Sequence, residues 1–125
     1  MEHMYNVAYD SDAGIVRMST TGFWDTQTVT ALGAELYPLL VKVKASGRPV
    51  LVLSDARDYP VQSAEVGQAF ARMDADLAPL RTRLAMVVSS TLNKMQARRA
   101  AGDAVGFFTS YEDAEEWLLS GDEPA

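Results

Sequence analysis

The stretch Pro49-Val-Leu-Val-Leu-Ser-Asp55 decides the fold of this chain. Its four apolar residues run without interruption between a turn at Gly47-Arg48-Pro49 and a polar break at Asp55. Such a run, bounded by turn residues, is typical of a strand that is buried on both faces of a parallel sheet. We therefore expect the other strands and the helices to be arranged around it.

Length and composition limit the class of protein. The chain has 125 residues, 48% of them hydrophobic, which predicts one domain over 1–125 with a frayed leader at 1–3 and a frayed tail at 120–125. The absence of cysteine excludes disulfides and thiolate metal sites. A signal-peptide pattern and a membrane-length apolar run are both missing, so we expect a cytoplasmic protein. The net charge of -6 argues against binding to nucleic acid.

Strand and helix patterns alternate along the chain. Residues 4–9 and 15–20 flank a turn-rich segment and predict a hairpin. The whole pattern predicts the order ββαβαβαβα, an α/β fold with a mixed five-stranded sheet whose parallel strands are joined by right-handed crossovers. The remaining strands are expected at 50–54, 83–89 and 105–109, and the helices from Asp25 or Thr26 to Val43, from Ser63 to Pro79, over about 91–101, and from Tyr111 to Leu118.

Three segments and the order of elements resemble a known family. The segments are Val50-Leu-Val-Leu-Ser-Asp55, Leu84-Ala-Met-Val-Val-Ser-Ser90 followed by Gln96-Ala-Arg-Arg99, and Phe107-Phe-Thr-Ser-Tyr-Glu-Asp-Ala-Glu-Glu-Trp-Leu118. Over nearly the whole chain the pattern is similar to the SpoIIAA-like, or STAS-like, family of small bacterial domains. The resemblance implies a (βα) superhelix, distantly similar to Sec14-type lipid carriers. It also implies a binding module with no enzymatic activity and no cofactor.

The loops after the parallel strands form the candidate interaction edge. Ligands and partners of α/β proteins meet the carboxyl ends of the strands, where these loops gather. Several aromatic and hydrogen-bonding residues fall there, which predicts a surface for a protein or for a lipophilic molecule. A purely structural role, in which the rings cover helix ends, explains Trp24 and Tyr111 equally well. The candidate edge residues are Phe23, Trp24, Asp55, Arg57, Tyr59, Ser89, Ser90 and Tyr111.

Ser63 is the candidate modification site. By position it resembles the serine that a partner kinase phosphorylates in anti-sigma-factor antagonists, where the added charge switches binding. The segment Val61-Gln-Ser-Ala-Glu65 lacks the acidic residue before and the glycine after that serine in those antagonists. An N-cap role, with Glu65 well placed against the helix dipole, is therefore favoured.

Other polar groups have simpler explanations than catalysis. Asp55, Arg57 and Asp58 are more consistent with an ion pair that holds a loop than with a metal or acid-base site. The only histidine, His3, lies in the predicted leader. The hydroxyls around Ser90 can hold an anion or cap the following helix, and capping is favoured. We predict no catalytic residue and no metal site.

The third predicted helix carries a basic face, formed by Lys94, Arg98 and Arg99, and the fourth predicted helix carries an acidic one. Such faces are ordinarily solvated or pair with each other. They also suit a charged partner or weak peripheral contact with an anionic membrane.

Two functions remain in view. The first is a non-enzymatic binding or regulatory domain that acts through protein-protein interaction, and an exposed aromatic edge would also suit a homodimer. The alternative is a small carrier of a lipophilic ligand with peripheral membrane association. In that case Pro38, which predicts a kink or broken turn near residues 34–38, would let the first helix move as a lid. A small hydrolase is disfavoured because no cysteine or plausible histidine supplies the chemistry.

Overall fold

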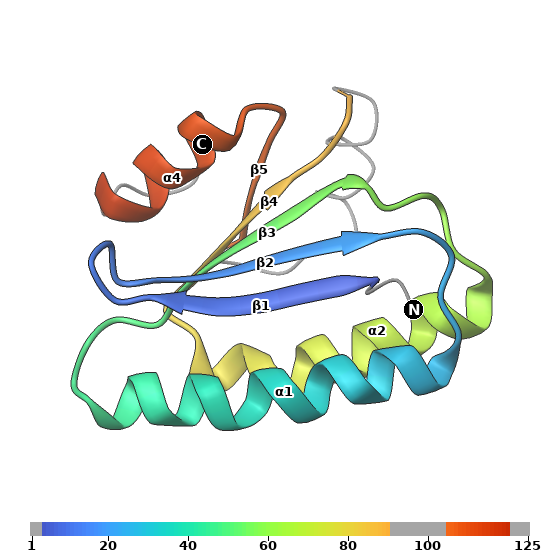
Figure 1. Cartoon of the computed structure of the whole chain (residues 1–125), viewed down its shortest axis with the longest axis horizontal. Coiled ribbons are helices and arrows are strands. Elements are labelled where there is room, and N and C mark those ends of the chain that lie inside the picture. The colour runs from blue at the N-terminus through green and yellow to red at the C-terminus, as the bar shows by residue number, and fades with distance from the viewer. Residues whose placement is uncertain (1–3, 91–104, 121–125) are drawn as a thin grey trace.

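A five-stranded mixed sheet forms the centre of the molecule (Figure 1). The computed structural model describes residues 4–90 and 105–120. The strands lie side by side in chain order, with β1 antiparallel to β2 and the other neighbours parallel. Their bounds are β1 Tyr5–Asp10, β2 Ile15–Thr21, β3 Leu51–Asp58, β4 Arg83–Val87 and β5 Val105–Phe108. The predicted mixed sheet with an N-terminal hairpin is confirmed.

Helices cover both faces of the sheet. Figure 1 shows α1 (Thr26–Ala45) and α2 (Ala64–Leu77) together below the sheet and α4 (Tyr111–Ser120) above it. A short 3-10 turn, η1 (Ala78–Leu80), follows α2 and contains Pro79, as predicted for the end of that helix. The predicted helix at 91–101 lies outside the described residues. Ser120, which was predicted to belong to the frayed tail, is still part of α4, and residues 121–125 lie outside the described residues.

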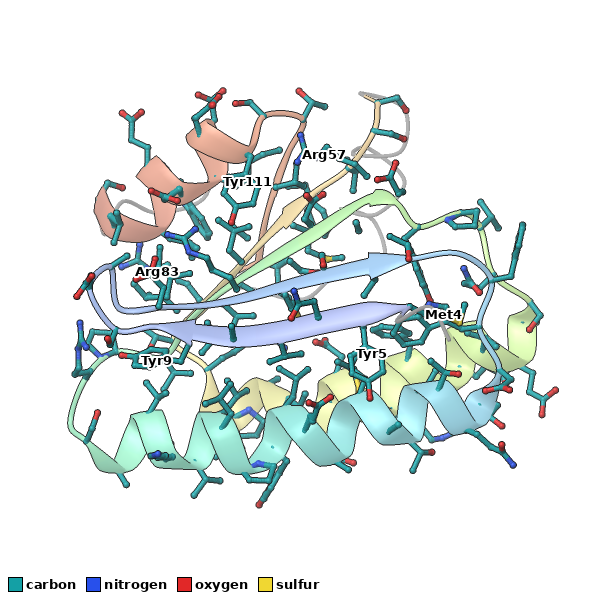
Figure 2. All side chains as sticks on the ribbon, in the orientation of Figure 1. Met4, Tyr5, Tyr9, Arg57, Arg83 and Tyr111 are labelled. Atoms are coloured by element: carbon teal, nitrogen blue, oxygen red, sulfur yellow. The ribbon has the colours of Figure 1, made fainter. Side chains whose placement is uncertain are left out.

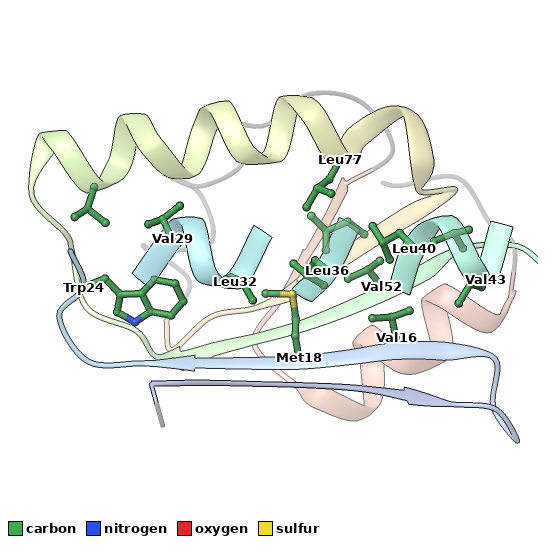
Figure 3. Packing of buried hydrophobic residues seen from close by; sticks show 13 residues of the cluster. Val16, Met18, Trp24, Val29, Leu32, Leu36, Leu40, Val43, Val52 and Leu77 are labelled. Carbon is green, nitrogen blue, oxygen red and sulfur yellow. The ribbon is translucent and has the colours of Figure 1, made fainter. Parts of the chain in front are cut away.

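The central strand β3 is buried on both faces, as its sequence predicts. Val52 packs in a cluster with the apolar side of α1, which includes Leu36 and Leu40 (Figure 3). Leu51 and Leu53 point to the opposite face and pack with α4. Because side chains alternate along a strand, one apolar run supplies both layers of the core.

β3 is longer than its sequence suggested. The polar break at Asp55 was expected to end the strand, yet pairing continues to Asp58, where a register shift leaves Asp58 opposite Thr21. The polar residues are tolerated because Asp55 and Arg57 pair with each other on the α4 side of the sheet. The strand predicted at 50–54 therefore ends four residues later than expected.

α1 begins where the capping pattern predicts and continues through its proline. The Asp25 side chain accepts a hydrogen bond from the Thr28 backbone N–H at 2.8 Å. Pro38 lies inside one continuous helix, so of the two outcomes predicted there the broken turn is wrong, and the kink stays a prediction. Proline removes a bond to the carbonyl of Ala34, and both residues are exposed, so water can solvate that carbonyl. The lid hypothesis loses the support that a broken helix would have given it.

A matched pair of glycine substitutions tests the packing of α4 against the sheet. An added Cβ at Gly106 would lie 2.8 Å from Phe108 Cε2 and 3.0 Å from Trp117 Cζ3, whereas one at Gly67 would meet nothing within 4 Å. We expect Gly106→Ala to lower the free energy of unfolding by about 1–3 kcal/mol through overpacking. Gly67→Ala changes an exposed position on α2 and should raise the free energy of unfolding by up to about 1 kcal/mol. Urea denaturation measures both; equal effects would contradict this packing.

Candidate functional site

The carboxyl ends of the parallel strands meet at one edge of the sheet. Ser19, Asp55, Val87 and Phe108 lie opposite one another in successive strand pairs, so they form one row across β2 to β5. The loops that follow this row therefore begin at nearly the same level. The strand register therefore brings these loops to one edge of the sheet, as the sequence predicts.

The sheet divides the predicted edge residues between its two faces. Trp24 and Tyr59 belong to the cluster on the side of α1 and α2. Asp55, Arg57 and Tyr111 lie on the α4 side, where Figure 2 shows Arg57 close to Tyr111. The eight candidates consequently do not form a single surface.

Trp24 is a core residue. Its side chain is only 7% exposed, and its ring packs against Tyr5, Tyr59 and Phe70 with centroid separations of 5.4–5.8 Å. The indole Nε1 donates to the carbonyl oxygen of Thr21 at 2.8 Å. Figure 3 shows the ring at one end of the apolar cluster, between the end of β2 and the helices. The structural explanation of Trp24 therefore holds, and its ring is not available to a partner.

Gln62 fastens two loops to each other. Its Oε1 accepts a hydrogen bond from the Trp24 backbone N–H at 2.8 Å. Its Nε2 donates to the carbonyl oxygens of Gly22 and Pro60, both at 2.9 Å. Two of these bonds join the β2–α1 loop to the β3–α2 loop, and the bond to Pro60 stays within the β3–α2 loop. Because it satisfies backbone groups on both loops, each loop is held in one position.

Two large apolar side chains protrude from these fastened loops. Phe23 is 74% exposed and Val61 is 89% exposed. Phe23 lies between Gly22 and Trp24, which both bond to Gln62, and Val61 immediately precedes Gln62. We call Phe23, Val61 and Gln62 the rim. The rim therefore presents two exposed apolar groups on loops that the hydrogen bonds of Gln62 join.

An open cleft of about 750 Å³ borders the rim. Val61 and Gln62 line it together with Phe70, Met86 and Val88, which give it an apolar wall. Of the predicted edge residues, it brings together Arg57, Tyr59 and Ser89. Ser90 is exposed and lies just beyond Ser89, after β4.

The polar residues on the α4 side form a separate network. Arg17 donates to Asp10 at 3.0 Å, to the Tyr111 hydroxyl at 2.9 Å and to Glu115 at 2.7 Å. The Arg57 guanidinium also lies 5.8 Å from the centroid of the Tyr111 ring. These contacts connect the hairpin and β3 to α4, so the network supports the attachment of that helix.

Asp55 and Tyr59 are poorly suited to proton transfer. Arg57 donates two side-chain hydrogen bonds to Asp55, at 2.7 and 2.9 Å, and these hold the pKa of that carboxyl below its usual range. Burial raises the pKa of Tyr59 to about 12. A general acid or base works best with a pKa near the operating pH, and these two groups are shifted away from it. The predicted ion pair between Asp55 and Arg57 is present.

Ser63 occupies the N-cap of α2. Its Oγ accepts a hydrogen bond from the Val66 backbone N–H at 3.2 Å, and Glu65 lies in the first turn of the helix. The favoured capping role is confirmed, and phosphorylation of this exposed residue stays a prediction. The predicted basic face, Lys94, Arg98 and Arg99, lies outside the described residues.

Sequence reasoning missed Gln62, Val61 and Arg17. Val61 carried a weak signal, because an apolar residue in a polar loop is one candidate for packing or binding among the many apolar residues that protein surfaces expose. Gln62 and Arg17 carried none, since the partners that they join across the fold lie 38 to 98 positions away in the chain. Within residues 4–90 and 105–120, no group of three or more His, Cys, Asp or Glu residues is placed to hold a metal ion. No helix in the described part of the chain is long and apolar enough to cross a membrane.

A solved structure shares this architecture. It is an uncharacterized protein of the DUF3478 family with a SpoIIAA-like fold, from Shewanella loihica PV-4. The two chains align over 91% of each with a TM-score of 0.67 and 17% sequence identity. No family model matches the sequence, and no curated protein does. The likeness shows the SpoIIAA-like fold that the sequence resemblance implied, and at this identity it shows the fold alone.

Replacing Gln62 tests whether it fastens the loops. We expect Gln62→Ala to lower the free energy of unfolding by about 1–3 kcal/mol, because backbone groups near buried Trp24 lose their partners. Gln68→Ala removes the same side chain from an exposed position on α2 and should change stability by less than about 0.5 kcal/mol. Chemical denaturation followed by Trp fluorescence measures both. Similar small effects for the two variants would show that Gln62 does not hold the loops.

Proposed function

We propose that this SpoIIAA-like chain is a non-enzymatic binding domain that recognises a protein partner through the rim. The observation that carries the proposal is the exposure of Phe23 and Val61 on loops that Gln62 holds in place. Aromatic and aliphatic side chains that enter a pocket on the partner commonly supply most of the binding energy in an interface. The rim has this composition.

A fixed backbone strengthens the case for binding. A flexible loop must be ordered when it binds, and that ordering lowers affinity. Here the hydrogen bonds of Gln62 and the buried ring of Trp24 order both loops before any partner arrives. The cleft beside the rim, with Phe70, Met86 and Val88 in its wall, offers a partner further apolar surface.

The chemistry of the same region supports a role without catalysis. The described residues include no histidine, and the whole chain has no cysteine. The Asp55 carboxyl group, on the strand beside the cleft, is held ionised by Arg57, and burial raises the pKa of Tyr59, in the cleft wall, to about 12. We therefore propose recognition as the function of this edge.

A cavity between the sheet and α2 favours a second candidate, the lipophilic carrier. It has a volume of about 310 Å³ and is lined mainly by apolar side chains, among them Val52, Phe70, Met73 and Met86. This volume is at the lower end of the range for small-molecule sites, about 300 to 1,000 Å³. Strands β4 and β5 both contribute to the lining of this cavity. Residues 91–104, which carry the predicted basic face, lie between these two strands in the sequence. Peripheral membrane contact through Lys94, Arg98 and Arg99 would belong to this candidate.

Ser63 offers a way to regulate the rim. It is exposed and follows Gln62 directly, so a phosphate there would add nearly two negative charges beside the proposed contact surface. Asp and Asn cap a helix about equally well. We therefore expect Ser63→Asp to weaken partner binding while Ser63→Asn leaves it unchanged and both variants stay folded. Equal binding by the two would remove the proposed switch.

A matched set of variants tests recognition at the rim. The full chain serves as bait in a lysate of its own cells, and proteins that it retains are identified and purified. Phe23→Ser combined with Val61→Ser should weaken the purified complex by about thirtyfold or more, the loss expected when a hot spot of about 2 kcal/mol is truncated. Tyr37→Ser removes another exposed ring, which is on α1 and outside the rim, and should not affect binding.

Two results would contradict the proposal. The first is a purified partner that the rim variant and the Tyr37 variant both bind as tightly as the unmodified chain does. The second is a constant extra mass on the chain in native mass spectrometry of protein purified from cells. A bound lipophilic compound of that kind would support the carrier instead.

A further inference from the structure

The outer edge of β1 is open in the described structure. β1 is the end strand of the sheet, and within residues 4–90 and 105–120 it pairs only with β2 (Figure 1). The Thr21 N–H donates to the Met4 carbonyl at 2.9 Å, which fixes the alternation of the ladder. In an antiparallel pair, residues alternate between bonding to the partner strand and pointing away from it. The backbone N–H and C=O groups of Tyr5, Val7 and Tyr9 therefore point outward.

We propose that a second copy of this chain pairs with β1 along this edge, antiparallel and around a two-fold axis at Val7. Val7 then lies opposite Val7 of the second copy, and Tyr5 lies opposite Tyr9 of the second copy. Each opposite pair of outward-pointing residues exchanges two hydrogen bonds, so the junction contains about six. All outward groups of Tyr5, Val7 and Tyr9 are then satisfied in both copies.

The sequence of β1 does not prevent such pairing. Proteins usually protect an open edge with lysine, proline, a bulge or an inward-pointing charge. Residues 5–9 contain no charged residue and no proline, and their register with β2 is uninterrupted. A strand that continues the sheet would therefore meet neither a charge nor a missing donor between Tyr5 and Tyr9.

The helix below the edge adds charge complementarity. β1 and α1 enclose a groove whose lining includes Tyr5, Val7 and Glu35, and Figure 2 shows the Tyr5 and Tyr9 side chains on the α1 side. Opposite residues of an antiparallel pair point to the same face, so the two copies of α1 lie on one face and run antiparallel. The half of α1 that carries Glu35 then meets the half that carries Lys42 and Lys44. This arrangement avoids like charges along the junction.

Molar mass and hydrogen exchange together test the junction. Light scattering on the full chain should give twice 13.6 kDa at high protein concentration and move toward 13.6 kDa on dilution. In the dimer the amides of Tyr5, Val7 and Tyr9 should be protected, and dilution should remove that protection. The amides of Asn6 and Ala8 bond to β2 and should stay protected throughout, which makes them an internal control.

Val7→Pro removes an outward donor without removing a bond to β2, and proline is tolerated at such an edge position. This variant should stay folded, with Asn6 and Ala8 still protected, and should remain at 13.6 kDa. The proposal is overturned if the unmodified chain is monomeric at every concentration. A chain that stays monomeric and whose β1 pairs only with a strand of another protein would overturn it as well. It is also overturned by a dimer in which the Val7 amide exchanges freely, or by a folded Val7→Pro variant that still dimerises.

Discussion

Burial of the Trp24 ring is the constraint on which this end of the molecule depends. The ring fills the space between the end of β2 and α2 and closes the core that α1 and α2 share. With its indole N–H bonded to Thr21, the β2–α1 loop is drawn against the sheet before α1 begins at its Asp25 cap. Phe23 cannot enter the same space, and it is left in solvent at 74% exposure. The exposed ring is thus a consequence of the buried one.

The two faces of the sheet use different kinds of interaction. On the side of α1 and α2, apolar packing dominates, and the few polar bonds, above all those of Gln62, hold loops. On the side of α4, a smaller apolar cluster is supplemented by the network around Arg17 and by Arg83, which donates to carbonyl oxygens at the end of α4. Partly exposed ion pairs contribute little each, so α4 depends on the close packing at Gly106 as well.

The sequence predicted the elements well because the apolar period is a local property. The run from Val50 to Leu53 identified the central strand, and the capping residues Asp25 and Ser63 fixed two helix starts. The length of β3 was missed because its polar end is stabilised by Arg57 across the same face, a pairing that hydrophobicity does not reveal. At Pro38 the broken turn, one of the two predicted outcomes, was wrong because the position of this residue on the exposed side of α1 was unknown.

The site was less predictable, since it depends on contacts between distant residues. Phe23 and Trp24 are adjacent aromatic residues in a loop, and only the folded arrangement decides which one is buried. Strand register was enough to predict that the loops meet at one edge, but side-chain alternation placed Arg57, and the packing of α4 placed Tyr111, on the face opposite Trp24. Gln62 became visible only through its three bonds to backbone groups.

The central claim is that Phe23 and Val61 are presented from rigid backbone. Nuclear magnetic resonance relaxation at their backbone amides measures this most directly. The account predicts order parameters near those of the helices, about 0.85. Values below about 0.6, the range of flexible segments, would show that the loops move independently and would contradict it.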